Sequence, residues 1–170
     1  MYMKINKPVT QFFIVGIFGT LWHFLYEWSG KNMFIGIIAP INESTWEHLK
    51  LLFFPVLIYS VIEYIVWKER SDNYISAAGI GLFGGMLAIT AFFYTYTGIL
   101  GFNIPALDIS SYFIGLFTML FIKSRIIRNK SFSSVYAAGI TLFFIIITAV
   151  LFGIFSFNAP ELGIFMPPRI

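Results

Sequence analysis

The sequence predicts an all-α fold, a polytopic integral membrane bundle of about five transmembrane helices. Hydrophobic residues make up 58% of the 170-residue chain and charged residues 11%, whereas an ordinary soluble domain has about 25% charged residues. Apolar segments long enough to cross a bilayer, about twenty residues each, recur along the chain. A soluble domain of this size cannot bury so much apolar surface, so we expect one transmembrane domain, residues 1–170, with the lipid bilayer as its partner.

The composition also excludes several classes of function. The chain has no cysteine, which excludes disulfides, thiolate metal sites and a cysteine nucleophile. The net charge of +3 resides in short loops between apolar segments, where basic residues indicate topology and not nucleic-acid binding. The glycines of Gly79-x-Gly81-x-x-Gly84 match a dinucleotide spacing, but they lie inside an apolar span and therefore carry no such meaning.

The first apolar segment, about residues 9–28, is too long for a signal peptide and is interpreted as a membrane helix. His23 and Glu27 are spaced i,i+4 near its end, so a continuous helix places them on one face. The next apolar piece, residues 33–41, is too short to span a bilayer. We expect it to be a re-entrant or interfacial segment.

Four more spans are expected, at about residues 46–67, 74–100, 104–122 and 134–157. The pattern Ser44-x-x-Glu47 predicts a capping box at the start of the second span. Pro55 lies in the middle of that span and predicts a kink there.

Ala77, Gly81 and Gly85 form a row of small residues on one face of the third span. Such a row predicts close helix packing and, where a second protein supplies the helix, self-association or docking of a partner. Residues 77–83 recur with six identities at 137–143. This echo is either a parallel repeat of helical hairpins, as some transporters have, or a chance match between apolar segments.

The basic residues predict the orientation of the chain, because five spans put the two termini on opposite sides. Eight of them fall on the N-terminal side: Lys4, Lys7, Lys68, Arg70, Lys123, Arg125, Arg128 and Lys130. Three fall on the other side: Lys31, Lys50 and Arg169. The positive-inside rule then predicts a multi-pass protein of the cell (plasma) membrane with a cytoplasmic N-terminus and an external C-terminus.

Residues 39–50 concentrate polar side chains between two strongly apolar spans, and ionisable groups at membrane depth usually mark function or ion pairing. Five candidate metal ligands are expected at this external face: His23, Glu27, Glu43, Glu47 and His48. Two histidines with carboxylates suit Zn²⁺ or Mn²⁺, so a divalent metal is the candidate cofactor. Glu47 and His48 are also candidate acid–base catalysts.

A small-ligand site is the alternative, with carboxylates walled by aromatic rings that favour a cationic or polyhydroxy ligand. Its candidate residues are Trp22, Tyr26, Asn42, Glu43, Trp46 and Asp108.

Structural interpretations of these residues stay open beside the functional ones. The aromatic residues fit an interfacial belt, Asp108 fits the first turn of a helix, and Glu47 fits one half of the capping box. Lys50 is expected to anchor at the interface or to pair with Glu47 or Glu27. Glu63 is expected to pair with Lys68 or Arg70.

Residues 22–30, followed by 39–51, resemble a family of small bacterial integral membrane proteins that is catalogued only as a domain of unknown function. The most specific part is Asn42-Glu43-Ser44-x-Trp46-Glu47-His48. The resemblance implies a bacterial inner-membrane protein and carries no activity. Where that family has Pro-Pro-His near its C-terminus, this chain has Ala159-Pro160-Glu161 and so replaces one imidazole with a carboxylate.

The sequence therefore predicts a membrane protein of unassigned activity with an external site for a metal ion or small ligand. A lipid-modifying enzyme at the outer leaflet and a small transporter or substrate-binding subunit are the alternatives. A third is an accessory protein in which the polar residues only tie the spans together. Whether the protein is an enzyme is left open.

Overall fold

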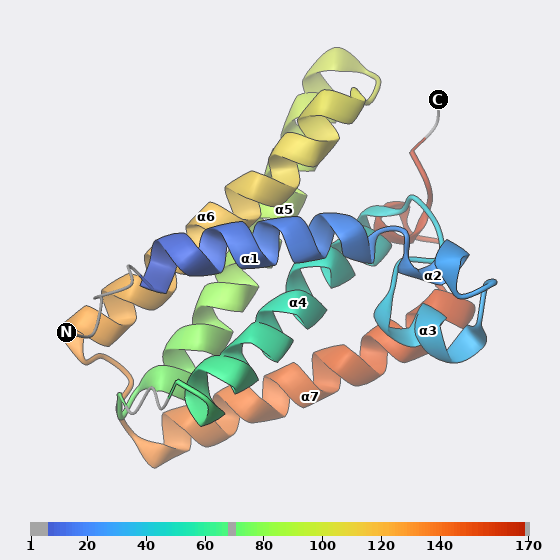
Figure 1. Ribbon diagram of the computed structural model, residues 1–170. Coiled ribbons are helices and arrows are strands. Elements are labelled where there is room, and N and C mark those ends of the chain that lie inside the picture. The colour runs from blue at the N-terminus through green and yellow to red at the C-terminus, as the bar shows by residue number, and fades with distance from the viewer. Residues whose placement is uncertain (1–6, 68–70, 169–170) are drawn as a thin grey trace.

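A computed structural model describes residues 7–67 and 71–168, and this part of the chain is all helical (Figure 1). Its elements are α1 (Lys7–Trp22), α2 (Leu25–Trp28), α3 (Met33–Ile38), α4 (Thr45–Ile65), α5 (Tyr74–Leu100), α6 (Pro105–Asn129), α7 (Val135–Phe157) and the short 3₁₀ helix η1 (Gly163–Phe165). The predicted helical membrane bundle is confirmed.

Four of the described helices, α4, α5, α6 and α7, are long and apolar enough to cross a membrane, while α1 is apolar but shorter. The expected first span, residues 9–28, is divided, because α1 ends at Trp22 and α2 begins at Leu25. The amide of Phe24 donates to the Leu21 carbonyl, three residues back, and this tight turn ends the α-helical hydrogen-bond pattern. The short α3 falls within the segment that was expected to be re-entrant or interfacial.

The helices give the molecule two ends of different character (Figure 1). We call α2, α3 and the turn between them, residues 25–38, the elbow, and the end that carries it the elbow end. The other end carries the start of α1 and the last turns of α6, with Arg125, Arg128 and Lys130, and we call it the basic end. Four of the basic residues that predict the orientation lie outside the described residues: Lys4, Lys68, Arg70 and Arg169.

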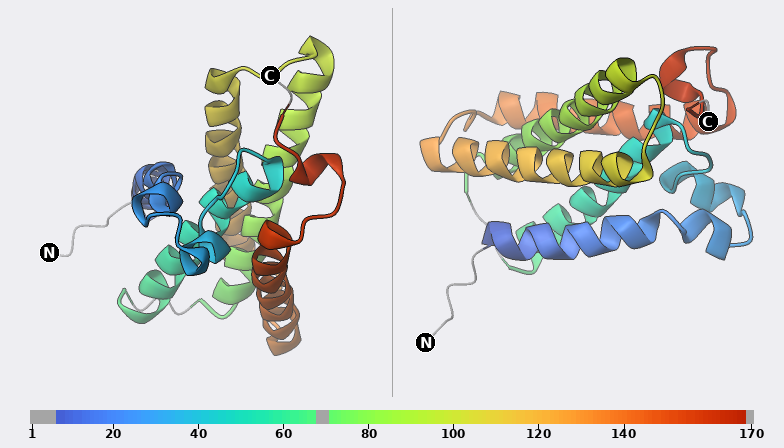
Figure 2. Two further views of the ribbon diagram at one scale, coloured as in Figure 1. Left: turned by 90° about the vertical axis from the view of Figure 1, so that its right-hand side faces the viewer. Right: turned by 90° about the horizontal axis from the view of Figure 1, so that it is seen from above.

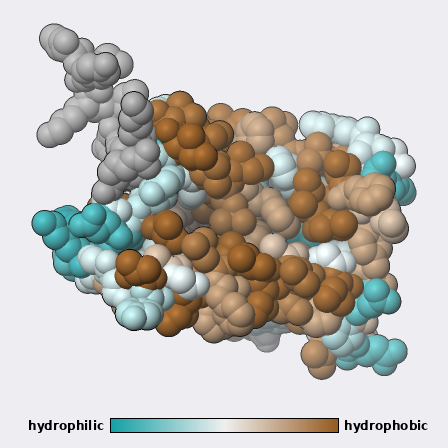
Figure 3. All heavy atoms as spheres, turned by 90° about the horizontal axis from the view of Figure 1, so that it is seen from below, coloured by the Kyte–Doolittle hydropathy of each residue, from teal (hydrophilic) through white to brown (hydrophobic). Residues whose placement is uncertain are grey.

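Viewed from above, α1 and α7 lie on opposite sides of the molecule, with α4 and the α5–α6 hairpin between them (Figure 2). Figure 3 shows a broad hydrophobic face between two ends where hydrophilic side chains gather. This distribution is the one expected of a chain that crosses a bilayer with both ends in water.

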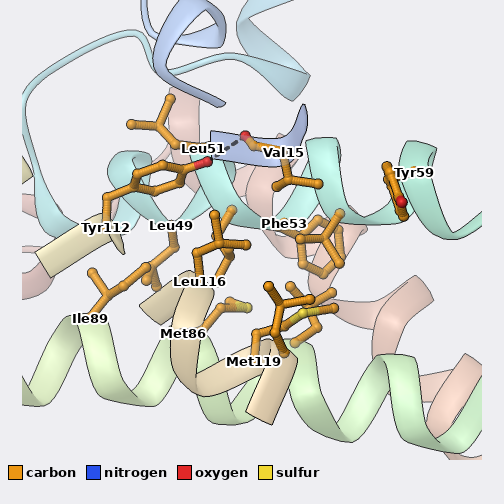
Figure 4. Close-up of a cluster of buried hydrophobic side chains, with 14 of the residues drawn as sticks. Val15, Leu49, Leu51, Phe53, Tyr59, Met86, Ile89, Tyr112, Leu116 and Met119 are labelled. Atoms are coloured by element: carbon orange, nitrogen blue, oxygen red, sulfur yellow. Dashed lines mark hydrogen bonds between the residues drawn. The ribbon is translucent and has the colours of Figure 1, made fainter. Parts of the chain in front are cut away.

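The apolar core surrounds α4, where Phe53 is fully buried against side chains from its neighbours (Figure 4). Leu116 and Met119 of α6 are also fully buried in this cluster. The hydroxyl of Tyr112 donates to the Val15 carbonyl at 2.7 Å and so joins α6 to α1. α4 is therefore held on several sides, which fixes the residues at both of its ends.

The row of Ala77, Gly81 and Gly85 is buried inside the chain. A methyl group added at Gly81 would lie 2.7 Å from the Met119 carbonyl oxygen, and one at Gly85 would lie 2.6 Å from that of Gly115. The predicted close packing is confirmed, and the neighbour is α6. The expectation that a second protein docks on this face is corrected, because α6 already covers it.

Candidate metal centre

Three of the candidate ligands meet at the elbow end: His23, Glu43 and His48, which we call the open triad. One ligand atom from each lies within 4.8 Å of the other two. Oε2 of Glu43 is 3.6 Å from Nε2 of His23 and 3.3 Å from Nε2 of His48. The two imidazole rings lie 5.4 Å apart between centroids. This set converges from three separate places in the chain: the end of α1, the loop after the elbow, and the first turn of α4.

The start of α4 is shaped by its own polar side chains. Oδ1 of Asn42 accepts the Ser44 amide at 2.8 Å, which turns the chain just before the helix. Ser44 is the N-cap, and its hydroxyl oxygen accepts the Glu47 amide at 3.4 Å. Caps of this kind satisfy amides that have no partner in the first helical turn. They also fix the directions in which Glu43 and His48 leave the backbone.

The carbonyl oxygen of Ser44 sets the tautomer of His48. Nδ1 of His48 lies 3.0 Å from that oxygen. A carbonyl oxygen only accepts, so Nδ1 carries the proton and donates it. Nε2 faces Glu43 at 3.3 Å. In the imidazolium form Nε2 donates to that carboxylate, and in the neutral ring it keeps a lone pair that can bind a metal ion. Histidines that bind metals are commonly held in this way by a hydrogen bond on the other ring nitrogen.

Glu43 is the accessible member of the open triad, with 64% of its side chain exposed, compared with 32% for His23 and 29% for His48. Hydrogen bonds from His23 and then from His48 hold the pKa of its carboxyl well below the usual range, although partial burial opposes them. The carboxylate is therefore ionised near neutral pH. It offers a negatively charged oxygen ligand that solvent can reach.

Glu47 has the opposite surroundings, because it is only 1% exposed. Its Oε2 accepts the Ile41 amide at 2.9 Å and the Lys50 ammonium at 2.8 Å. Its Oε1 accepts the hydroxyl of Ser156, in α7, at 2.8 Å. We call Glu47, Lys50 and Ser156 the closed network. Both oxygens of its carboxylate are hydrogen-bonded within this network, and Glu47 is not among the ligands that converge in the open triad.

Lys50 completes the closed network, because four acceptor oxygens surround the three N–H donors of its buried ammonium. Besides Glu47, its Nζ donates to Ser156 Oγ at 2.5 Å and to the carbonyls of Gly36 and Ala39 at 2.8 and 3.2 Å. Of the roles considered for Lys50, pairing with Glu47 is the one found. The network joins α3, α4 and α7, and so holds the elbow against the bundle.

The capping box is only half formed. Ser44 caps the Glu47 amide as predicted. The Glu47 carboxylate does not return to the Ser44 amide, which binds Asn42, and reaches the Ile41 amide instead. Glu47 therefore fixes the loop that precedes α4, which is the loop that carries Glu43.

The structure does not bring Glu27 or Asp108 into the open triad. Glu27 is exposed on α2 and pairs with Lys31 at 3.6 Å, because the break after Trp22 removes the continuous helix that would place it above His23. Asp108, in the first turn of α6, accepts hydrogen bonds from Tyr96 and Asn103. Its carboxylate thus closes the turn between α5 and α6.

The three aromatic candidates pack against the elbow and the tail. Nε1 of Trp22 donates to the Ile38 carbonyl at 2.9 Å and ties α1 to α3. Tyr26 lies against Gly36 of α3. Trp46 packs between Phe152 of α7 and Phe165 of η1, with ring centroids 4.7 and 5.1 Å away. These contacts give all three rings a structural role around the triad.

A second buried ion pair, which the sequence pattern did not reveal, lies toward the basic end. Nζ of Lys123 lies 2.5 Å from Oε2 of Glu63 and 2.9 Å from Oε1 of Gln11. The Tyr74 hydroxyl donates to the same Glu63 oxygen at 2.8 Å. Glu63 was expected to pair with Lys68 or Arg70, which lie outside the described residues. The available signal was the presence of Gln11 and Lys123 within otherwise apolar segments.

Two of the three ligand separations in the open triad are close to those around a tetrahedral metal ion, and all three ligand atoms lie within 4.8 Å of one another. Zn²⁺ binds imidazole nitrogen at about 2.0 Å, so two of its ligands lie about 3.3 Å apart. The two Glu43–His separations, 3.6 and 3.3 Å, are close to that value. Three protein ligands also leave a fourth position open, as in catalytic and not structural zinc sites. The same set of two histidines and a carboxylate suits Fe²⁺.

A sequence model of a family of unknown function, DUF6512, matches residues 2–168, nearly the whole chain. The chain belongs to this family. No curated protein and no solved structure matches it.

Proposed function

Since the DUF6512 family to which this chain belongs carries no assigned activity, we propose from the geometry that the protein is a divalent-metal-binding membrane protein. The ion is held by His23, Glu43 and His48. The observation that carries the proposal is the convergence of these three ligand atoms within 4.8 Å of one another. In this account the chain is one transmembrane domain of a bacterial inner membrane. Its N-terminus is cytoplasmic, and the elbow end faces the exterior.

The buried carboxylate of Glu47 and the exposed carboxylate of Glu43 together explain how such a site stays intact beside a bilayer. The closed network fixes the Ile41 amide and the elbow, so the loop that presents Glu43 has little freedom. Ligands that are held in place before binding lose less conformational entropy when the ion arrives. Glu43 itself remains exposed, which gives the ion a route from solvent.

The residues of the site have distinct roles in this proposal. His48 is oriented by Ser44 and supplies Nε2. His23 supplies a second imidazole, and Glu43 neutralises one of the two charges of the ion. The chemistry that a divalent ion supplies at an open position is Lewis-acid polarisation of an oxygen atom or activation of water. The sequence makes Glu47 a candidate for acid–base catalysis. It acts here as a positioning residue through Ile41 and Lys50.

Metal titration of the purified protein in detergent tests the proposal. We expect one equivalent of Zn²⁺ or Fe²⁺ by elemental mass spectrometry after mild desalting. Substituting His48→Ala or Glu43→Ala should weaken binding at least about 100-fold, because each removes a direct ligand. Glu27→Ala is the matched control and should bind as wild type, because Glu27 pairs with Lys31. Stoichiometric metal that survives in both ligand variants would overturn the assignment.

A further inference from the structure

The elbow carries an exposed apolar surface directly beside the proposed metal centre. Three side chains of the elbow form it, Trp28 (66% exposed), Met33 (59%) and Phe34 (73%), together with Phe24 (47%), which directly precedes the elbow. These residues do not belong to the long membrane-crossing helices, where exposed apolar side chains simply face lipid. We call this set the apolar elbow.

The rest of the elbow is fixed, so the exposure is a property of a rigid element. Trp22 and Lys50 both donate to carbonyls of α3, at Ile38 and Gly36 respectively. A methyl group added at Gly36 would lie 3.2 Å from the ring of Phe157, in the last turn of α7. One face of α3 is thus packed on the bundle, and Met33 and Phe34 are left outside it.

Short apolar helices that lie at one end of a membrane bundle fit the boundary between head groups and acyl chains. Trp28 stacks on Phe24 with centroids 5.8 Å apart, and tryptophan is enriched at that boundary. The ion pair of Glu27 and Lys31 stays exposed at the same elbow. The elbow is thus apolar on one part and charged on another, as an interfacial element must be.

His23 immediately precedes Phe24, so the open triad lies at the level of the elbow. A divalent ion bound by one carboxylate and two neutral imidazoles keeps one net positive charge and an open position. The anionic oxygen group that a bilayer presents at this level is the phosphate of a lipid head group. Lipid phosphate can therefore fill the open position of a positively charged ion that lies at this depth.

We propose that the apolar elbow inserts into the outer leaflet and that the metal centre takes the phosphate of an anionic lipid as its ligand. This inference rests on the proposed metal site and deepens it, because it names the substrate class as membrane phospholipids. The apolar elbow sets how deeply the site lies in the leaflet, and the ion held by the open triad carries the positive charge that attracts the phosphate.

Spin labels test the insertion independently of any metal, since the natural chain has no cysteine. We place single labels through Phe34→Cys and, as matched control on the same elbow, Glu27→Cys, in lipid nanodiscs. Oxygen, which dissolves in lipid, should speed the relaxation of the label at position 34 more than chromium oxalate does. Chromium oxalate, which stays in water, should have the larger effect on the label at position 27. Equal access of chromium oxalate to both positions would overturn the insertion.

Cobalt-substituted protein tests the ligand, because the visible spectrum of Co²⁺ reports its coordination. We compare two samples: nanodiscs that contain phosphatidic acid, and phosphatidylcholine nanodiscs to which inorganic phosphate is added in the same amount as the phosphatidic acid. Phosphatidic acid should change the spectrum at a concentration at least about tenfold lower than inorganic phosphate does. The double variant Trp28→Ser, Phe34→Ser should lose that preference and keep its cobalt affinity.

The outcomes separate the two proposals. Failure of Co²⁺ to bind the wild type would overturn the metal site, and with it the lipid ligand, whatever the spin labels show. Binding of Co²⁺ with equal responses to inorganic phosphate and phosphatidic acid would overturn the lipid ligand alone. A lipid preference that persists in the double variant would overturn the role of the elbow.

Discussion

Glu43 and Glu47 lie four positions apart in the sequence and have opposite environments. Glu47 is buried and accepts bonds from Ile41, Lys50 and Ser156. Glu43 is 64% exposed and faces two histidines. A buried carboxylate whose two oxygens both accept hydrogen bonds from the protein serves the fold, whereas an exposed one that faces two imidazoles is free to bind a ligand. Burial and partners, and not residue type, separate the two roles.

The largest effect should come from breaking the closed network. Lys50→Met leaves Glu47 buried without its cation, and removal of one partner from a buried ion pair costs about 3–5 kcal/mol. Chemical unfolding in detergent micelles measures the loss. The matched control is Lys31→Met, which removes a cation from the exposed pair with Glu27 and should cost under about 1 kcal/mol. Similar losses in both variants would show that the Lys50 pair contributes no more than an exposed one.

The buried pair of Glu63 and Lys123 tests whether the two ends of the molecule are independent, because it lies far from the open triad. Glu63→Gln should destabilise the protein by about 3 kcal/mol, because it removes the carboxylate charge that lies 2.5 Å from the buried Lys123 ammonium. Glu63 is sixteen residues from Glu47 along α4, which is about 24 Å, so Zn²⁺ affinity should stay within about twofold of wild type. A titration of folded Glu63→Gln that shows greatly weakened Zn²⁺ binding would contradict the independence of the two ends.

A smaller effect is expected at Ser156, which binds both partners of the closed network. Ser156→Ala removes those hydrogen bonds, leaves the ion pair in place, and should cost about 1–2 kcal/mol. Because the network positions the loop before α4, Zn²⁺ affinity should also fall, by about tenfold. Ser110→Ala is the control on an exposed hydroxyl that bonds its own helix. Unchanged Zn²⁺ affinity in Ser156→Ala would remove the positioning role.

The smallest effect concerns pH in the absence of metal. The lowered pKa of Glu43 means that its interaction with the histidines stabilises the fold above the ordinary carboxyl pKa, about 4.3. That stabilisation is lost as the pH falls through the lowered value. With chelator present, wild type should therefore exceed Glu43→Gln in stability near neutral pH, and the difference should shrink as the pH falls below about 4. A difference that stays constant down to about pH 2 would contradict this origin.

Several features of the fold were predictable because they depend on local or periodic patterns. Apolar length indicated the membrane helices, and Ser44 was recognisable as a helix cap. The small residues at 77, 81 and 85 indicated a close helix contact. The identity of the contacting helix was not predictable, because it depends on which helix the tertiary fold places there.

For the candidate site too, some features were predictable from the sequence and others depended on the tertiary fold. His23, Glu43 and His48 were among the predicted ligands, and the structure brings them together. Glu27 was included on helical spacing, and a single tight turn after Trp22 removed it. Ser156 could not be assigned from sequence, because it lies more than a hundred residues from Glu47 and Lys50. Contacts at that separation leave no periodic trace in the chain.

X-ray absorption spectroscopy of the zinc-loaded protein counts the imidazoles bound to the ion and so tests whether the open triad holds it. We expect two imidazole ligands, with oxygen completing a four-coordinate site. The count should fall to one in His23→Ala loaded at high Zn²⁺. A wild-type spectrum with only oxygen ligands, or with a histidine count that His23→Ala and His48→Ala leave unchanged, would contradict the claim that the open triad is the metal centre.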